Sequence, residues 1–269
     1  MMNVIIPQHA HSVRLPRKAF RKICGIPLVA WSVIQAKAAH CVDKVYVSTE
    51  SDEIADICTP YGAEIIWRPT WLRDKAFAAN VPLEHALGVA GLQDLHGPFM
   101  CKLATAPLLF PDDIDRLYQK FMASPDIPVG PGKQVILAAP AQEACVYTRI
   151  RDPRDCMSMT RYIDKDDNIL IPQGALNVMY ADAYVPSNRR AEWYLNANAV
   201  KDADADVNMV TYQMMLGTAM QYYVPCRKWQ TYDIDDEQDL EVCEMFMEHK
   251  ILKGRGPEVY YEYAEGKSE

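Results

Sequence analysis

The 269-residue chain is 49% hydrophobic and 24% charged, enough apolar material for one large or two modest folded domains. Its net charge of −8 argues against general nucleic-acid binding, which draws on basic surface. Apolar stretches such as 27–34 are far shorter than the ~20 residues that span a bilayer, and the N-terminus resembles no secretory leader. Eight cysteines lie singly along the chain with no C-x-x-C pair. We therefore expect a cytoplasmic protein with free thiols and no membrane partner.

Short β-rich runs alternate with helical patterns through the first half of the chain. The expected strands are 3–7, 44–49, 63–68, 99–103 and 135–141, and the expected helices are 27–39, 52–61, 81–95 and 111–123. The last of these helices opens with Pro111-Asp112-Asp113, a typical N-terminal signal. This alternation predicts an α/β fold with a mostly parallel sheet covered by helices.

The pattern changes after residue 141. Residues 145–172 contain turn-forming Asp-Pro and Asp-Asp-Asn and are interpreted as an insertion of irregular or hairpin segments. A final strand is predicted at 230–235, followed by a helix from Glu237 to about Lys250 with Asp236 as its N-cap. We expect one domain over 1–253 and a flexible tail over 254–269, whose tyrosines are available for docking.

Three segments with chemically useful side chains follow predicted strands. QHAHSVRLPRK (8–18) comes after the first strand, ATAPLLFPDD (104–113) after the fourth, and Asp233-Ile-Asp235 at the end of the late strand. Ligands in open α/β sheets bind outside the carboxyl ends of the strands, so these segments are expected at one binding edge. The five positively charged side chains between residues 14 and 22 have two interpretations. They serve this binding edge, or they form an ordinary solvated basic surface.

Asp233 and Asp235 are the candidate metal ligands. Residues two apart in an extended strand point to the same face, so both carboxylates can be presented together. Two carboxylates suit magnesium, which keeps several waters and takes further oxygens from substrate phosphates. The alternative is the ordinary preference of acids for a helix start, which describes Asp236 and the following acids well.

The basic loop and the acidic pair together would let a nucleoside triphosphate lie across the edge of the sheet. Arg14 and Lys18 would neutralise phosphate oxygens, and no covalent nucleophile is required for such a transfer. An alternative reading makes His9 and His11 a metal pair of a hydrolase. The other four histidines, His40, His85, His96 and His249, fall within or beside predicted helices, which leaves that metal without further ligands.

With these residues, the chain resembles the cytidylyltransferases that activate acidic sugars, the CMP-sialic acid and CMP-Kdo synthetases. The segments that carry the likeness are IIP…SVRLPRK, CGIPLVAWSV (24–33), VYVSTESDEIADICTPYGAEI (45–65), QGALNVMY (173–180) and DIDDEQDLEVCE (233–244). The resemblance implies a Rossmann-like three-layer α/β/α fold and a homodimer built partly by an inserted arm, here 145–172. It also implies magnesium and the reaction of CTP with a sugar acid to give CMP-sugar and pyrophosphate.

The resemblance assigns roles residue by residue. Arg14, Lys18 and Asp235 are the expected catalytic residues, and Asp233 and Asp235 are the expected metal ligands. The nucleotide site is expected to comprise His9, His11, Ser12, Arg14, Lys18 and Thr105.

Two loops depart from the family pattern. The family's first loop usually reads A-R-G-G-S-K-R-L-P-R-K, whereas this chain has His9, Ala10-His11 and Val13. Its Q-P-T-S-P-L-R loop is replaced here by a segment that begins with Leu103 and ends with Leu109. The sequence thus leaves open a divergent nucleotidyltransferase and a non-catalytic relative that binds a nucleotide-sugar or a partner, and it specifies neither base nor acid.

Overall fold

The computed structural model describes residues 1–12, 14–69, 72, 80–92, 97–124, 134–140, 162–163, 169–180 and 221–267. Val13 and the segment 186–215 lie outside the described residues. Of the expected arm 145–172, only 162–163 and 169–172 are described. Among the described residues, no helix combines the length and apolarity needed to cross a membrane. The six cysteines in this part of the chain are free thiols, buried or half-buried.

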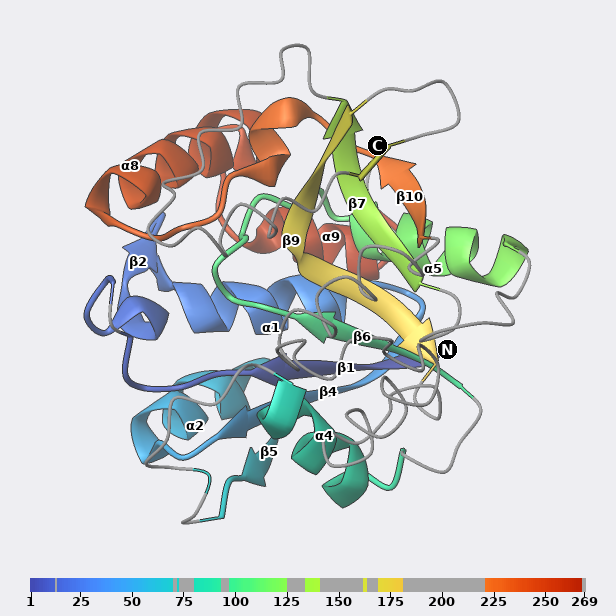
Figure 1. Ribbon diagram of the computed structural model, residues 1–269. Coiled ribbons are helices and arrows are strands. Elements are labelled where there is room, and N and C mark those ends of the chain that lie inside the picture. Colours follow the sequence, from blue (N-terminus) through green and yellow to red (C-terminus); the bar gives the residue numbers. More distant parts are fainter. Residues whose placement is uncertain are drawn as a thin grey trace, which may run out of the picture.

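One large sheet forms the centre of the molecule (Figure 1), with the strand order β10-β7-β9-β6-β1-β4-β5 and β8 paired to β9. Its strands are β1 Met2–Pro7, β4 Val42–Thr49, β5 Glu64–Trp67, β6 Pro98–Lys102, β7 Gln134–Pro140, β8 Tyr162–Ile163, β9 Ile169–Tyr180 and β10 Gln221–Pro225. Strand β1 runs parallel to β4 and β6, β4 to β5, and β7 to β10. Strand β9 runs antiparallel between β6 and β7. The expected mostly parallel sheet is confirmed, with one antiparallel strand in its middle.

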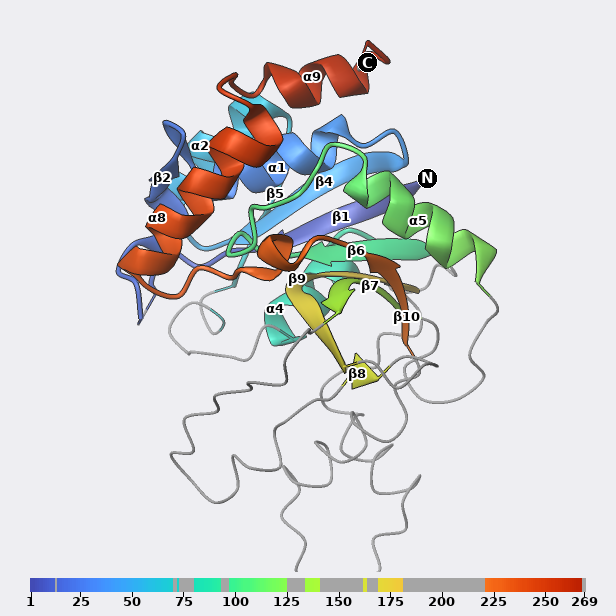
Figure 2. The same ribbon diagram turned by 90° about the horizontal axis from the view of Figure 1, so that it is seen from above.

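Helices cover both faces of this sheet (Figure 2), with α1, α2, α5, α8 and α9 on one side and α4 on the other. Their bounds are α1 Leu28–Ala38, α2 Asp52–Cys58, α4 Asn80–Val89, α5 Asp113–Ala123, α8 Glu237–Phe246 and α9 Glu258–Ala264. Short 3-10 turns are η1 Lys18–Phe20, η2 Thr59–Tyr61 and η4 Lys228–Thr231, and a π-helical stretch, η5 Met247–Leu252, continues α8. A small hairpin, β2 Lys22–Ile23 and β3 Ile26–Pro27, leads into α1. The three-layer α/β/α architecture is as expected.

The apolar run of β1 explains why the sheet is covered on both sides. Val4 and Ile6 belong to the core cluster beneath α1, α2 and α5, while Ile5 belongs to the cluster beneath α4. Alternate residues of a strand point to opposite faces, so an unbroken apolar strand needs a helix layer on each side.

The expected strand at 230–235 is wrong. Residues 228–231 form η4, residues 232–235 have no regular structure, and the last strand is β10 at Gln221–Pro225. Gln230 is buried and donates from Nε2 to Asp113 Oδ2 at 2.7 Å and to the Leu108 carbonyl at 3.2 Å. These bonds hold the segment against the start of α5 and the loop after β6, so it does not pair as a strand of the sheet.

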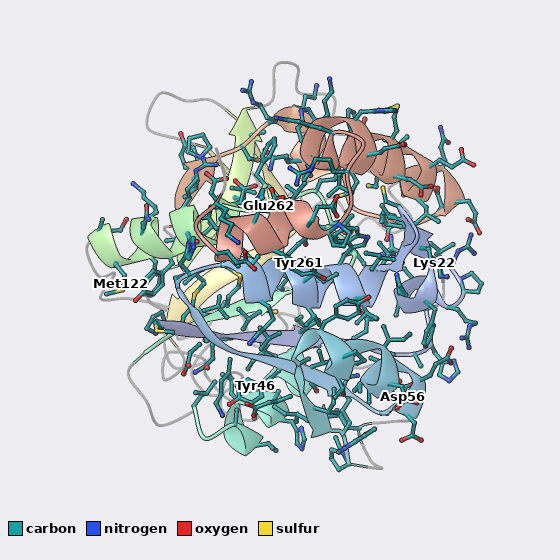
Figure 3. The ribbon with its side chains drawn as sticks, turned by 180° about the vertical axis from the view of Figure 1, so that it is seen from behind. Lys22, Tyr46, Asp56, Met122, Tyr261 and Glu262 are labelled. Atoms are coloured by element: carbon teal, nitrogen blue, oxygen red, sulfur yellow. The ribbon has the colours of Figure 1, made fainter. Side chains whose placement is uncertain are left out.

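The expectation of a flexible C-terminal tail is also wrong at α9. Tyr260 is fully buried, its hydroxyl donates to the Leu109 carbonyl, and its ring lies 5.9 Å from that of Trp31. The Tyr263 hydroxyl donates to Asp115 at 2.8 Å. The tyrosines therefore dock α9 against α1 and α5. Figure 3 shows α9, marked by Tyr261 and Glu262, next to α1.

We expect Tyr260→Phe to lower the free energy of unfolding by about 1–2 kcal/mol, because it leaves the buried Leu109 carbonyl without its donor. The matched control is Tyr261→Phe on the same helix, because Tyr261 is 44% exposed. Figure 3 labels Tyr261 on α9. Urea unfolding of both variants measures the difference. Equal stabilities would show that the Tyr260 hydroxyl does not hold α9.

Candidate functional site

The loop after β1 lies at the carboxyl edge of the parallel strands. The Gln8 amide donates to the Ser48 carbonyl at 2.9 Å, which extends the contact of β1 with β4 by one residue. The chain then turns through Arg17, whose φ of 55° is in the left-handed region, into η1. This turn places Lys18 inside, with only 9% of the residue exposed, while the side chain of Arg14 is 73% exposed.

Asp235 joins this loop to the segment after η4. Its carboxylate accepts a bond from Arg14 Nη1 and one from Lys18 Nζ at 3.1 Å. Lys18 Nζ also donates to the Ile234 carbonyl. Three residues that the sequence analysis assigned to catalysis are therefore in direct contact, although more than 200 positions separate the aspartate from the two cations.

Asp233 lies beside them and bonds to the third segment. The side chains of Asp233 and Thr105 are hydrogen-bonded, and the Ile234 amide donates to the Thr105 carbonyl at 2.9 Å. Desolvation by surrounding atoms and the nearby Asp235 raise the pKa of Asp233, while the Thr105 bond, Lys18 and Arg14 oppose this rise. The structure thus brings Thr105 and both aspartates together at one edge, as the sequence analysis predicted, but from a loop instead of a strand.

The start of α8 holds this loop in place. Asp236 caps the helix by accepting from the Asp239 amide at 3.0 Å, which confirms the expected N-cap. The Asp239 carboxylate accepts in return from the amides of Asp235 at 2.9 Å and Asp236 at 3.2 Å. Asp239 therefore fixes the backbone of Asp235 while leaving its side chain free to face the basic loop.

Two residues at this edge were missed by the sequence analysis. Glu50, just after β4, accepts from His9 Nδ1 at 2.7 Å and from the Ala10 amide at 2.8 Å. Arg68, just after β5, donates to the other oxygen of Glu50 at 3.4 Å and is 2% exposed. Their positions just after two neighbouring parallel strands were the available signal.

The other expected site residues, His9, His11 and Ser12, lie on the loop after β1. Ser12 is half-buried and His11 is exposed. His9 faces Glu50, and in the described part of the chain no three His, Cys, Asp or Glu side chains converge as a metal-binding group.

Leu109 is fully buried in the core under α5, so this position serves packing where the family carries an arginine.

The family follows from comparison with known proteins. A family model described as cytidylyltransferase matches residues 3–252, nearly the whole chain. The chain belongs to the cytidylyltransferase family. The match includes both the basic loop and the segment of Asp233 and Asp235.

Individual relatives of this cytidylyltransferase family match over shorter stretches. The pseudaminic acid cytidylyltransferase of Campylobacter jejuni is 31% identical over 120 residues, 44% of this chain and 52% of that protein. The CMP-N,N'-diacetyllegionaminic acid synthase of Legionella pneumophila is 38% identical over 76 residues, 28% of this chain and 31% of that one. The chain thus spans about half or less of the length of these curated relatives.

Solved structures agree on the fold. A CMP:2-keto-3-deoxy-manno-octonic acid synthetase complexed with CTP superimposes with a TM-score of 0.63 at 14% identity, covering 93% of this chain and 100% of that one. A 4-diphosphocytidyl-2C-methyl-D-erythritol synthase gives a TM-score of 0.54 at 10% identity, over 91% of this chain and 99% of that one. At these identities the likeness supports the Rossmann-like architecture alone.

Proposed function

We propose that this protein transfers CMP from CTP to a sialic acid-like or related acidic sugar, with release of pyrophosphate and dependence on magnesium. The observation that carries the proposal is the contact of Asp235 with Arg14 and Lys18, next to Asp233 and Thr105. Family membership supports the cytidylyl transfer, and the activities for which the relatives are named support an acidic sugar as acceptor.

The ion pairs of Asp235 with Arg14 and Lys18 have a direct use in nucleotide binding. Arg14 is largely exposed and can turn from Asp235 to a phosphate oxygen, and Lys18 supplies a second cation from inside the loop. A bound triphosphate would take over both cations and release the carboxylate of Asp235. One set of charge pairs is thereby exchanged for another, which limits the desolvation cost of binding.

The carboxylates that this exchange releases are suitable ligands for magnesium. Asp233 and Asp235 offer two hard carboxylates side by side, and the charge of Asp235 is one of the causes that raise the pKa of Asp233. Magnesium bound there would neutralise charge on the phosphates of CTP. Arg14 and Lys18 would stabilise the negative charge that develops on the departing pyrophosphate.

The reaction itself balances without a covalent enzyme intermediate. The hydroxyl oxygen of the sugar bonds to the α-phosphorus, and the bond from that phosphorus to the oxygen bridging to the β-phosphate breaks. Pyrophosphate leaves with the electron pair, and the hydroxyl proton must be accepted by a base.

A pyrophosphate-release assay tests the proposal. We expect release from CTP, and much less from ATP, GTP or UTP, when pseudaminic acid, N,N'-diacetyllegionaminic acid or Kdo is offered as acceptor. Adding EDTA should abolish the signal, and excess magnesium should restore it. Release of no pyrophosphate from any nucleotide across these acids would refute the proposal and favour a non-catalytic family member.

We also infer from the family resemblance a cytoplasmic homodimer with an arm within 145–172. The support is the turn-rich composition of that insertion together with the family likeness. Sedimentation equilibrium of the full chain measures the mass, and a mass of one 30.5 kDa subunit would contradict the dimer.

A further inference from the structure

His9 and Glu50 form a hydrogen-bonded pair that the nucleotide-binding scheme above does not use. His9 Nδ1 lies 2.7 Å from Glu50 Oε1, and their side chains are 27% and 11% exposed. His9 is two residues beyond the end of β1, on the loop that carries Arg14 and Lys18. Glu50 approaches from β4, the strand next to β1.

The carboxylate of Glu50 is fixed on both oxygens. Oε1 also accepts from the Ala10 amide at 2.8 Å, and Oε2 faces Arg68 Nη1 at 3.4 Å. Arg68 is held in turn by Ser48, to whose carbonyl it donates at 2.8 Å and to whose hydroxyl it donates at 3.2 Å. Glu50 thus has little freedom to leave His9.

This carboxylate is ionised at neutral pH. Burial alone would raise the pKa of Glu50, but hydrogen bonds from His9 and Ala10 outweigh burial and lower it. The charged group that bonds to His9 is Glu50, and Arg68 lies behind Glu50. His85 of α4 lies near Arg68, and burial followed by that positive charge lowers the pKa of His85.

An ionised carboxylate at Nδ1 determines the tautomer of the neutral imidazole. The ring proton sits on Nδ1 and donates to Glu50, so Nε2 carries a free lone pair. Within the described residues no hydrogen bond engages Nε2, and the partly exposed ring is open to a ligand at the edge of the sheet. A carboxylate, an oriented imidazole and an available Nε2 are the parts of a general base.

We infer that His9 is the general base of the proposed reaction and that Glu50 is its positioning residue. The inference rests on the proposed function. In this step Nε2 takes the proton of the sugar hydroxyl while its oxygen bonds to the α-phosphorus and pyrophosphate departs with the electron pair. The imidazolium then returns its proton to solvent. This role would place the acceptor sugar toward the β4 side of the loop, away from Asp235 and the proposed metal site.

The competing role for His9 is simple positive charge, as a replacement for the arginine that the family carries in this loop. His9→Arg separates the two roles, because arginine supplies a permanent cation and cannot act as a base near neutral pH. His9→Gln removes both the charge and the base. Glu50→Gln keeps the shape of the positioning residue and removes its charge.

The experiment compares these three variants with the wild type in steady-state pyrophosphate release and in calorimetric CTP binding. We expect His9→Arg and His9→Gln to lower kcat about 10²–10³-fold, with the Kd for CTP changed less than about threefold in His9→Arg. Glu50→Gln should lower kcat about tenfold or more. The kcat of the wild type should fall at acid pH, and this acid limb should be missing from the residual activity of His9→Arg. His249→Arg, a 66% exposed site on η5, controls for the added charge.

Wild-type or higher kcat in His9→Arg would overturn the inference and make His9 a phosphate-binding cation. Retention of kcat in His9→Gln would overturn both roles. A wild type that releases no pyrophosphate with any acid would instead refute the proposed function, so the two failures are distinguishable. A variant that still binds CTP in the calorimeter has an intact nucleotide site, so its loss of kcat is not a loss of folding.

Discussion

Replacing Asp235 by Asn should lower kcat/KM for pyrophosphate release by about 10³-fold or more, on the order of 4 kcal/mol of transition-state stabilisation. The carboxylate contacts both cations of the basic loop and is one of two oxygen donors proposed for magnesium. Asn is isosteric but carries no charge, so it removes both roles without opening a cavity. The side chain is 34% exposed, and the fold should lose little stability.

The matched control for this variant is Glu237→Gln, two residues further along the same helix start. Glu237 pairs with Arg21, and its side chain is 61% exposed. Its loss should change kcat/KM less than about twofold, since exposed ion pairs contribute little. Equal activity losses in the two variants would indicate that the charge of the helix start, rather than Asp235 itself, supports activity.

Replacing Lys102 by Met should raise the free energy of unfolding at pH 7 by on the order of 3–5 kcal/mol. Lys102 is the last residue of β6 and is fully buried, and within the described chain its ammonium has no hydrogen-bond partner. Burial lowers its pKa from 10.5 to about 7. The folded protein therefore favours the neutral amine, and an unfolded chain favours the charged form.

The pH dependence of this effect has a definite sign. Above about pH 10.5 the Lys102 amine is neutral in both states, and the penalty is absent. As the pH falls from 10.5 to 7, folding must release a proton, so the stability of the wild type falls. Below about pH 7 the full penalty is present. Lys102→Met should remove this dependence between pH 7 and 10.

Urea unfolding at pH 7 and pH 10 measures the prediction. Lys44→Met is the matched control, because Lys44 also lies on a strand but pairs with Glu64 at 3.0 Å at a half-exposed position. The control should change stability by less than about 1 kcal/mol. A destabilised Lys102→Met variant at both pH values would show that the buried amine has a stabilising partner.

The parallel part of the fold could be predicted from the sequence because its local signals agree. The apolar runs of β1, β4 and β6 and the helix signals at Asp112-Asp113 and Asp236 all favour the elements that form. Strand β9 could not be predicted in the same way. It contains Pro172 and Gly174, which weaken a strand locally, and it forms because β6 and β7 pair with it from both sides.

The candidate site could be predicted at those residues that the sequence places directly after an expected strand. The rule that ligands bind at carboxyl ends of strands pointed to the loop of Arg14 and Lys18, to Thr105 and to Asp235, which are in contact or linked through Asp233. Glu50 and Arg68 belong to no motif, and their one signal in the sequence is that each directly follows a strand. Only the parallel register of β1, β4 and β5, with Pro7 opposite Ser48 and Ser48 opposite Ile66, brings them to the loop.

The most direct test of the central claim is calorimetric titration of the wild type and Asp235→Asn with CTP at saturating magnesium, with ATP, GTP and UTP as comparisons. Binding of CTP in preference to the other nucleotides, weakened at least tenfold in Asp235→Asn, is the predicted result. No CTP binding to the wild type, or equal binding to both proteins, would contradict a nucleotide site built on Arg14, Lys18 and Asp235.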